Sequence, residues 1–223
     1  MEDEIKEISR MGISPEDISE ILGCSESLVV RVLEKENSEI PVTRKKKNVR
    51  FVDLGLPSGT LWADRNIGAT APEETGDYFR WGWTDPFRNN QGNPYKSPPK
   101  GIKEIAGTRY DAATAILGEG CRMPTEERFK QLIECCLWQW TQSKGVKGMK
   151  VRGPNGNYIF LPAAGYRNYS DGGLNGVGSG GFYWSATAYS GTGGRCMYFD
   201  SGGVIWNYSN RSYGCSVRAV KEK

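Results

Sequence analysis

Apolar residues in the first forty positions recur at the three- and four-residue spacing of short amphipathic helices. The residues that carry this pattern are Ile5, Ile8, Met11, Ile13, Ile18, Ile21, Leu22, Leu28, Val29, Val32 and Leu33. Gly12 ends the first segment, and Ser14 followed by Pro15 is a typical helix start, in which the serine caps free amides. Gly23 separates the second segment from the third. We therefore expect a small trihelical module over residues 1–38.

After Val49 the pattern changes to short strand-like runs that Gly, Pro and Asn interrupt. Residues 52–63 have the pattern of a strand, a tight turn and a second strand. Asp111–Leu117 and Thr125–Cys136 are the helical candidates, since each has apolar residues on one face. The sequence thus predicts an α+β domain over residues 49–223, with short twisted antiparallel strands and two helices.

Two stretches near the C-terminus alternate with the period of half-buried strands. They are residues 195–200 and 204–207, and the turn Ser201–Gly203 joins them. We assign six positions to the scaffold: Trp184, Met197, Phe199, Val204, Trp206 and Val217. The predicted ligand-binding face consists of Tyr189, Ser190, Thr192, Cys196, Tyr198, Asp200, Ile205, Asn207, Tyr208, Ser209 and Tyr213.

The composition of residues 151–220 supports a contact surface, because this segment contains no Lys, Glu or Gln. Tyrosine supplies a large amphipathic contact with few torsions to fix, while Ser, Gly and Asn add adaptable hydrogen bonds, as in antibody binding sites. Lys and Glu lose more side-chain entropy when they are fixed and are depleted from interface cores. The alternative is a Gly-rich β-region that lacks long charged side chains for no functional reason.

Charge is distributed unevenly along the chain. Residues 1–40 contain eleven acidic and four basic residues, whereas a basic run, Arg44–Lys47, follows in a predicted linker over residues 39–48. Neither module is strongly basic, so charge alone does not indicate a nucleic-acid partner. Contact of residues 1–48 with a protein, by docking or oligomerisation, and contact with DNA both stay open.

Residue types and segments that are missing exclude several classes of function. The chain has no histidine, which removes the usual general base and the commonest metal ligand, so we expect no catalytic residue, metal or cofactor. The six cysteines are irregularly spaced and no export signal precedes them, so free thiols are expected. No run of apolar residues is long enough for a membrane span. A cytoplasmic or virion-associated location follows as an expectation.

Four segments carry a resemblance to a known family: "VDLGLPSGTLWADRNIGATAPEETGDYFRWG", "CRMPTEERFKQLIECC", "NYIFLPAAGYRN" and the closing "FYWSATAYS" with "SVRAV". Together they resemble the Bacteroidetes and Fibrobacter paralogous family, whose fold is C-type-lectin-like and related to formylglycine-generating enzymes. Cys121 departs from the family pattern, which often has Trp at this position. The phrase "GISPEDISEILGCSESLVVRVLEKEN" resembles the helix-turn-helix of small phage and transposon proteins.

The closing segment is also similar to the variable region of target proteins of diversity-generating retroelements. That resemblance implies a hypervariable ligand-binding protein in which template adenines are mutated, so that Asn codons never become Lys, Glu, Gln, Met or Trp. A protein or cell-surface ligand is implied, but its identity, the oligomeric state and the host genome are not.

Three other functions are set against this expectation. A DNA-binding regulator with a lectin-like sensor is one, and an enzyme of the formylglycine-generating type that uses Cys196 or Cys215 is another. Calcium-dependent sugar binding would need clustered carboxylates. Asn168, Asp171 and Asn175 are candidates for holding an ion, although a solvated turn explains them as well.

Overall fold

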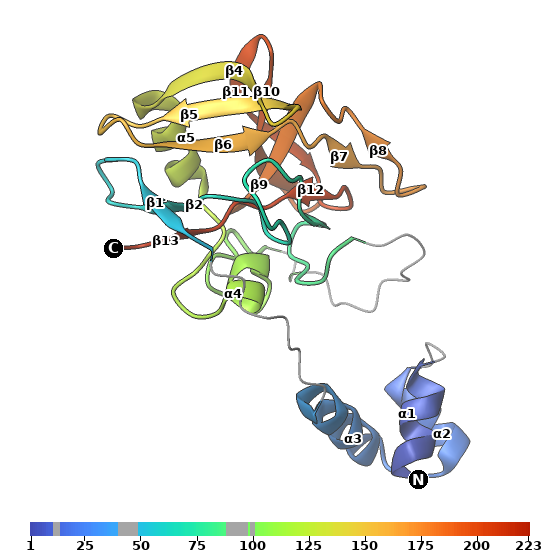
Figure 1. Ribbon diagram of the computed structural model, residues 1–223. Coiled ribbons are helices and arrows are strands. Elements are labelled where there is room, and N and C mark those ends of the chain that lie inside the picture. Colours follow the sequence, from blue (N-terminus) through green and yellow to red (C-terminus); the bar gives the residue numbers. More distant parts are fainter. Residues whose placement is uncertain (11–13, 40–48, 88–97, 99–100) are drawn as a thin grey trace. The chain divides into compact units, whose positions relative to one another are not determined.

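The computed structural model describes residues 1–10, 14–39, 49–87, 98 and 101–223. The chain divides into two compact units, Met1–Lys46 and Lys47–Lys223 (Figure 1). The predicted basic run Arg44–Lys47 lies outside the described residues. Within the part of the chain that is described, we find no helix with the length and apolar character needed to span a bilayer.

The N-terminal unit consists of α1 (Glu2–Arg10), α2 (Pro15–Leu22) and α3 (Glu26–Glu39). The Ser14 hydroxyl caps α2 by accepting a hydrogen bond from the amide of Asp17, and Gly23 ends this helix in the left-handed conformation. Four side chains, Ile5, Ile18, Val29 and Val32, form the buried core of this unit. The apolar periodicity therefore corresponds to a small trihelical core.

The larger unit combines few helices with many short strands, which confirms the α+β class. Its helices are α4 (Ala112–Leu117) and α5 (Glu126–Cys135), and Asp111 and Thr125 cap them with their side chains. Its strands are β1 (Phe51–Asp53), β2 (Leu61–Ala63), β3 (Tyr78–Phe79), β4 (Leu137–Ser143), β5 (Val146–Arg152), β6 (Tyr158–Pro162), β7 (Tyr166–Arg167), β8 (Leu174–Asn175), β9 (Gly180–Ala188), β10 (Gly193–Asp200), β11 (Gly203–Asn210), β12 (Cys215–Ser216) and β13 (Val220–Lys221).

The strands form sheets with the orders β11-β10-β9-β12-β3, β4-β5-β6, β1-β2-β13 and β7-β8. All pairings are antiparallel except that of β12 with β9. In Figure 1, β4, β5 and β6 lie side by side in front of α5, while α4 lies below the strands. The sheet that contains β9, β10 and β11 carries most of the predicted ligand-binding face and is the centre of the site described below.

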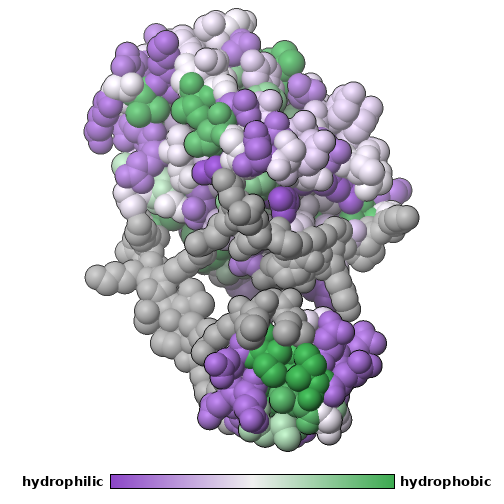
Figure 2. All heavy atoms as spheres, turned by 90° about the vertical axis from the view of Figure 1, so that its right-hand side faces the viewer, coloured by the Kyte–Doolittle hydropathy of each residue, from purple (hydrophilic) through white to green (hydrophobic). Residues whose placement is uncertain are grey.

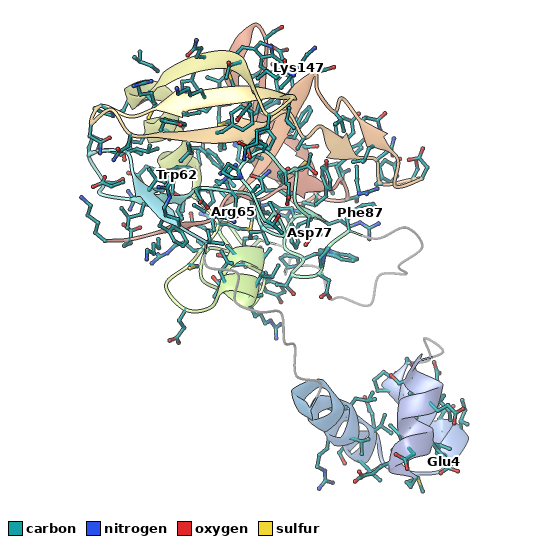
Figure 3. All side chains as sticks on the ribbon, in the orientation of Figure 1. Glu4, Trp62, Arg65, Asp77, Phe87 and Lys147 are labelled. Atoms are coloured by element: carbon teal, nitrogen blue, oxygen red, sulfur yellow. The ribbon has the colours of Figure 1, made fainter. Side chains whose placement is uncertain are left out.

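Two hydrophobic clusters cover the opposite faces of this sheet. Successive side chains of a strand point to opposite faces, so each strand contributes to both clusters. Tyr183, Met197 and Phe199 point to the first cluster, which joins the sheet to α5 and to β5 and β6. Trp62 of β2, labelled in Figure 3, belongs to this cluster and lies 5.3 Å, ring centroid to centroid, from Phe129. Trp184 points to the second cluster, which also contains side chains of β3 and α4.

A buried arginine ties distant segments of the larger unit together. Arg218 is fully buried and donates hydrogen bonds to the carbonyl oxygens of Ala63 (3.0 Å) and Phe160 (2.8 Å) and to Oδ1 of Asn66 (2.9 Å). Burial lowers the pKa of this guanidinium, although the neighbouring Tyr183 hydroxyl opposes the shift. The planar guanidinium satisfies three acceptors at once, which an ammonium group cannot do with the same geometry.

Candidate ligand-binding surface

The predicted contact residues lie mainly on β10, on β11 and on the turn between β9 and β10. Five of them are largely exposed: Tyr189, Ser190, Thr192, Ile205 and Tyr208. Another five are half-buried: Tyr198, Asp200, Asn207, Ser209 and Tyr213. Such partial burial holds a side chain in one place while it still offers a surface to a ligand, so both groups are accessible from solvent.

Five aromatic rings form a continuous row across one face of the sheet, which we name the tyrosine row. It runs Tyr198, Phe182, Tyr166, Tyr213 and Tyr169, with successive ring centroids 4.6, 5.1, 5.4 and 5.4 Å apart. Three of these contacts are edge-to-face, an arrangement that aromatic quadrupoles favour. Contributions come from β7, β9, β10 and two loops, so the row depends on the folded sheet.

Polar and aliphatic groups border the tyrosine row at β10 and β11. The Tyr198 hydroxyl donates a 2.8 Å hydrogen bond to Asp200, and this bond, with a backbone hydrogen bond from Gly202, lowers the pKa of the carboxyl. Burial first, and then this bond, raise the pKa of Tyr198. Ile205 pairs with Tyr198 across the strands and is 54% exposed. The surface therefore offers aromatic, aliphatic and anionic groups side by side.

A second aromatic group, which we name the tyrosine stack, lies on the opposite face of β10 and β11. Tyr189 and Tyr208 stack with centroids 4.0 Å apart, and the guanidinium of Arg195 lies 4.5 Å from the Tyr189 ring. Arg195 also approaches Glu126 of α5 at 3.6 Å. The Glu126 carboxylate accepts a hydrogen bond from Trp206 Nε1 at 2.9 Å, which anchors β11 to the helix.

Burial would raise the pKa of Glu126, but the net shift is downward. A hydrogen bond and the charge of Lys130 oppose burial, with further help from Arg195 and Trp206. The carboxylate is therefore held in its charged form beside the tyrosine stack.

Two residues of the predicted face, Cys196 and Tyr208, do not lie on the same surface as the rest of the tyrosine-row face. Cys196 is fully buried, because Trp184 and the second cluster cover the face to which it points. Tyr208 pairs with Arg195 and shares a face with Trp206, so it lies opposite to Ile205. The predicted residues therefore form two surfaces, which meet along β11, and not one contiguous patch.

The sequence prediction missed three members of the tyrosine row and one member of the tyrosine stack. Tyr166 and Tyr169 belong to the segment "GYRNYS", which spans β7 and the start of the following loop and whose Tyr, Asn and Ser composition matches the predicted face. This composition was the available signal. Phe182 and Arg195 gave no such signal, because nothing in their own neighbourhood distinguishes them from scaffold residues.

Scaffold residues lie below both surfaces. Trp184, Met197, Phe199 and Val217 are fully buried, whereas Val204 and Trp206 are partly buried and pack against the first cluster. Trp184 Nε1 donates a 2.7 Å hydrogen bond to the carbonyl oxygen of Phe79, which orients the indole between β9 and β3. The exposed aromatic groups thus rest on a layer of buried apolar side chains, in which hydrogen bonds orient the indoles of Trp184 and Trp206.

The cysteine thiols of this half are poor nucleophiles in the folded chain. Cys196 and Cys215 are fully buried, and burial raises the pKa of Cys196 to about 12 and that of Cys215 well above its usual range. None of the six cysteines, all of which lie in the described part of the chain, forms a disulfide. Since the thiolate is the reactive form, neither buried sulfur is prepared for thiol chemistry at neutral pH.

The loop between β7 and β8 uses its polar side chains for its own turns. Asp171 accepts a hydrogen bond from the amide of Gly173, and Asn168 accepts one from the amide of Ser170. Asn175 donates to the carbonyl oxygen of Gly173. Across the residues that the structure describes, no three Cys, Asp or Glu side chains are grouped so that they could hold a metal ion.

Two clefts lie on other parts of the larger unit. One, of about 480 Å³, is next to the start of α5 and is lined by both acidic and basic side chains, among them Glu126, Arg128 and Glu222. The other, of about 710 Å³, lies between β1 and the β5–β6 hairpin. The lining of these two clefts includes no ring of the tyrosine row.

The N-terminal unit presents exposed apolar residues among acidic ones. Ile21 is 60% and Val30 38% exposed. Figure 2 shows a hydrophobic area on this unit between two hydrophilic areas. Glu26 also lies exposed at the start of α3, where its carboxylate would face phosphate groups if this helix entered a DNA groove.

Comparison with known protein families gives a match over the C-terminal part of the chain. A family described as a domain of unknown function (DUF8237) matches residues 136–220, which cover β4 to β12 and include both tyrosine surfaces. No curated protein and no solved structure matches the chain.

Proposed function

We propose that this chain is a non-catalytic recognition protein that displays a variable ligand-binding face on a C-type-lectin-like scaffold, encoded with a diversity-generating retroelement. The tyrosine row is the observation that carries the proposal. A row of partly exposed rings on a rigid sheet provides a large contact area at a small entropic cost. The ligand is a protein or another cell-surface molecule, since an open surface of this kind suits a macromolecule.

The chemistry of the surrounding residues supports recognition over catalysis. The buried thiols of Cys196 and Cys215 have raised pKa values, which disfavours an activity of the formylglycine-generating type. The half-buried and exposed positions around the row carry residue types that an Asn codon reaches by adenine mutation, whereas the buried Met197 lies outside that set. Variation at the surface would therefore leave the core intact.

A display experiment tests whether this face accepts new ligands. In one library, six positions on the tyrosine-row face are varied among the residue types that mutated Asn codons encode: Tyr198, Asp200, Ile205, Asn207, Ser209 and Tyr213. In a matched control library, six exposed positions of β4, β5 and β6 are varied in the same way: Leu137, Gln139, Gln142, Lys147, Arg152 and Tyr158. Both libraries are displayed on phage and selected against immobilised lysozyme and serum albumin.

The proposal predicts folded binders to both proteins from the first library and few from the control. Loss of folding in most members of the first library would contradict it, as would equal recovery of binders from both libraries. A separate observation tests the retroelement: the neighbouring DNA should contain a near-identical repeat that differs where it has adenine, beside a reverse-transcriptase gene. Its absence would refute the retroelement and leave the binding face to be judged by the libraries.

A further inference from the structure

β11 is the outer strand of its sheet, and half of its backbone groups point away from β10. Asp200 pairs with Gly203 around a two-residue turn, and the pair that closes such a turn is hydrogen-bonded. Hydrogen-bonded and non-hydrogen-bonded residue pairs therefore alternate from this point along β10 and β11. Ile205, Asn207 and Ser209 then bond to β10. The amides and carbonyls of the intervening residues, Val204, Trp206 and Tyr208, point outward.

Few of these outward groups form a hydrogen bond with another described residue. The Tyr208 amide donates to the side-chain oxygen of Asn207 at 2.8 Å, which agrees with an outward direction. No hydrogen bond between described residues reaches the outward amides and carbonyls of Val204 and Trp206. β11 pairs with β10 over eight consecutive residues without a bulge and contains neither a charged residue nor proline. Natural edge strands usually carry a bulge, a charged residue or a proline, because these features prevent pairing with a further strand.

The distribution of exposed side chains indicates what could bind here. Ile205, on the face of the tyrosine row, and Tyr208, in the tyrosine stack, are each 54% exposed. They project from opposite faces of one strand. A ligand that touches a single face would meet only one of them. A strand added to the edge of β11 places alternate side chains on both faces, so it reaches both surfaces at once.

We propose that the edge of β11 binds an extended peptide segment of the protein ligand by β-strand addition, with alternate ligand side chains on the tyrosine row and on the tyrosine stack. This inference deepens the proposed function and rests on it for the identity of the surface. Main-chain hydrogen bonds to Val204 and Trp206 supply affinity that does not depend on side-chain identity. Side chains on the two faces then supply specificity, which variation at the surface can change.

The peptide segment also has an expected charge pattern. Asp200, the last residue of β10, lies beside the start of β11, and Arg195 of β10 pairs with Tyr208 toward the other end, where Glu126 offsets its charge. A bound segment with a basic residue near Asp200 would be favoured over one with an acidic residue at that place. Between these ends, aromatic or aliphatic side chains fit the exposed Ile205 and Tyr208.

The test uses the full chain, immobilised, with random linear dodecapeptides displayed on their messenger RNA as the probe. Recovered peptides are synthesised with a single N-methyl group at each amide in turn. Strand addition requires that methylation weaken binding about tenfold at alternate amides and have little effect at the intervening ones. Ile205→Lys should weaken binding to a similar extent, whereas Leu137→Lys, at an exposed position of the outer strand β4, should not.

Three results would overturn the proposal. One is the recovery of no peptide that distinguishes the wild-type chain from Ile205→Lys. The second is methylation effects without a period of two residues. The third is dimerisation of the free chain that Ile205→Lys abolishes, because β11 would then pair with a second copy. Peptides that depend on Tyr198 or Tyr213 but show no alternation would refute strand addition and leave the proposed recognition face standing.

Discussion

Phe199 joins the sheet that carries both tyrosine surfaces to the sheet formed by β4, β5 and β6. Its ring is fully buried, stacks on Tyr183 with centroids 5.7 Å apart, and contacts Trp138 and Trp140 at 6.4 and 6.5 Å. Replacing Phe199 with alanine removes all three ring contacts and leaves a space that the two sheets cannot readily close. The surfaces above this ring depend on its position, so its truncation tests the scaffold directly.

The expected loss of stability follows from the burial of the side chain. Truncation of a buried phenylalanine to alanine costs about 3–5 kcal/mol of the free energy of unfolding, through lost burial and the remaining cavity. For a domain of this size each kcal/mol lowers the melting temperature by roughly 2–4 °C, so we expect a decrease of roughly 6–20 °C. Phe199→Leu, which retains most of the volume, should be affected less.

Tryptophan fluorescence during urea unfolding measures this effect in the full chain. All seven tryptophans belong to the larger unit, so the signal follows that unit alone. Leu137→Ala is the matched control, because Leu137 is 74% exposed on β4 and its truncation should change the unfolding free energy by about 0.5 kcal/mol or less. If Phe199→Ala costs no more than this control, Phe199 does not hold the two sheets together.

Two further predictions concern titratable groups. In the folded chain at pH 8, iodoacetamide should modify Cys24 and Cys121, which are half-buried, and leave Cys196 and Cys215 intact until urea is added. Peptide mass spectrometry measures this, and equal rates at Cys121 and Cys196 would show that Cys196 is accessible. The pKa of Glu126 in the folded chain lies below its ordinary value of 4.5, so its stabilising contribution is present above about pH 4.5 and is lost as the pH falls through the lower folded pKa. The stability difference between the wild type and Glu126→Gln should therefore shrink below pH 4.5, and a difference that grows on acidification would contradict the assigned ion pairs.

The helices were predictable because their signals are local. Ser14, Asp111 and Thr125 each cap a helix at the position that the sequence pattern indicates. The inward direction of Met197 and Phe199 was equally accessible, since a two-residue period is a property of the strand itself. These features need no knowledge of which distant segments pack together.

The burial of Cys196 was not predictable in this way. Alternation places Cys196 on the same face as Tyr198, but it cannot tell that Trp81, more than a hundred residues earlier in the chain, helps to cover one end of that face. Its residue type placed Tyr208 among the contact residues. Tyr208 is two residues after Trp206 on β11, however, so its side chain lies on the same face as Trp206. Coverage of a sheet face is decided by long-range packing, which a single sequence does not reveal.

The pairing of β2 with β13 has a consequence for synthesis of the protein. Trp62 of β2 lies opposite Val220 of β13, so this strand meets one of its two neighbours only after almost the whole larger unit has been translated. Until then the nascent chain presents an unpaired strand edge and an indole that belongs to the core. Translation that stalls before β13 should leave a product that aggregates or is degraded, so complete synthesis is a condition for a folded protein.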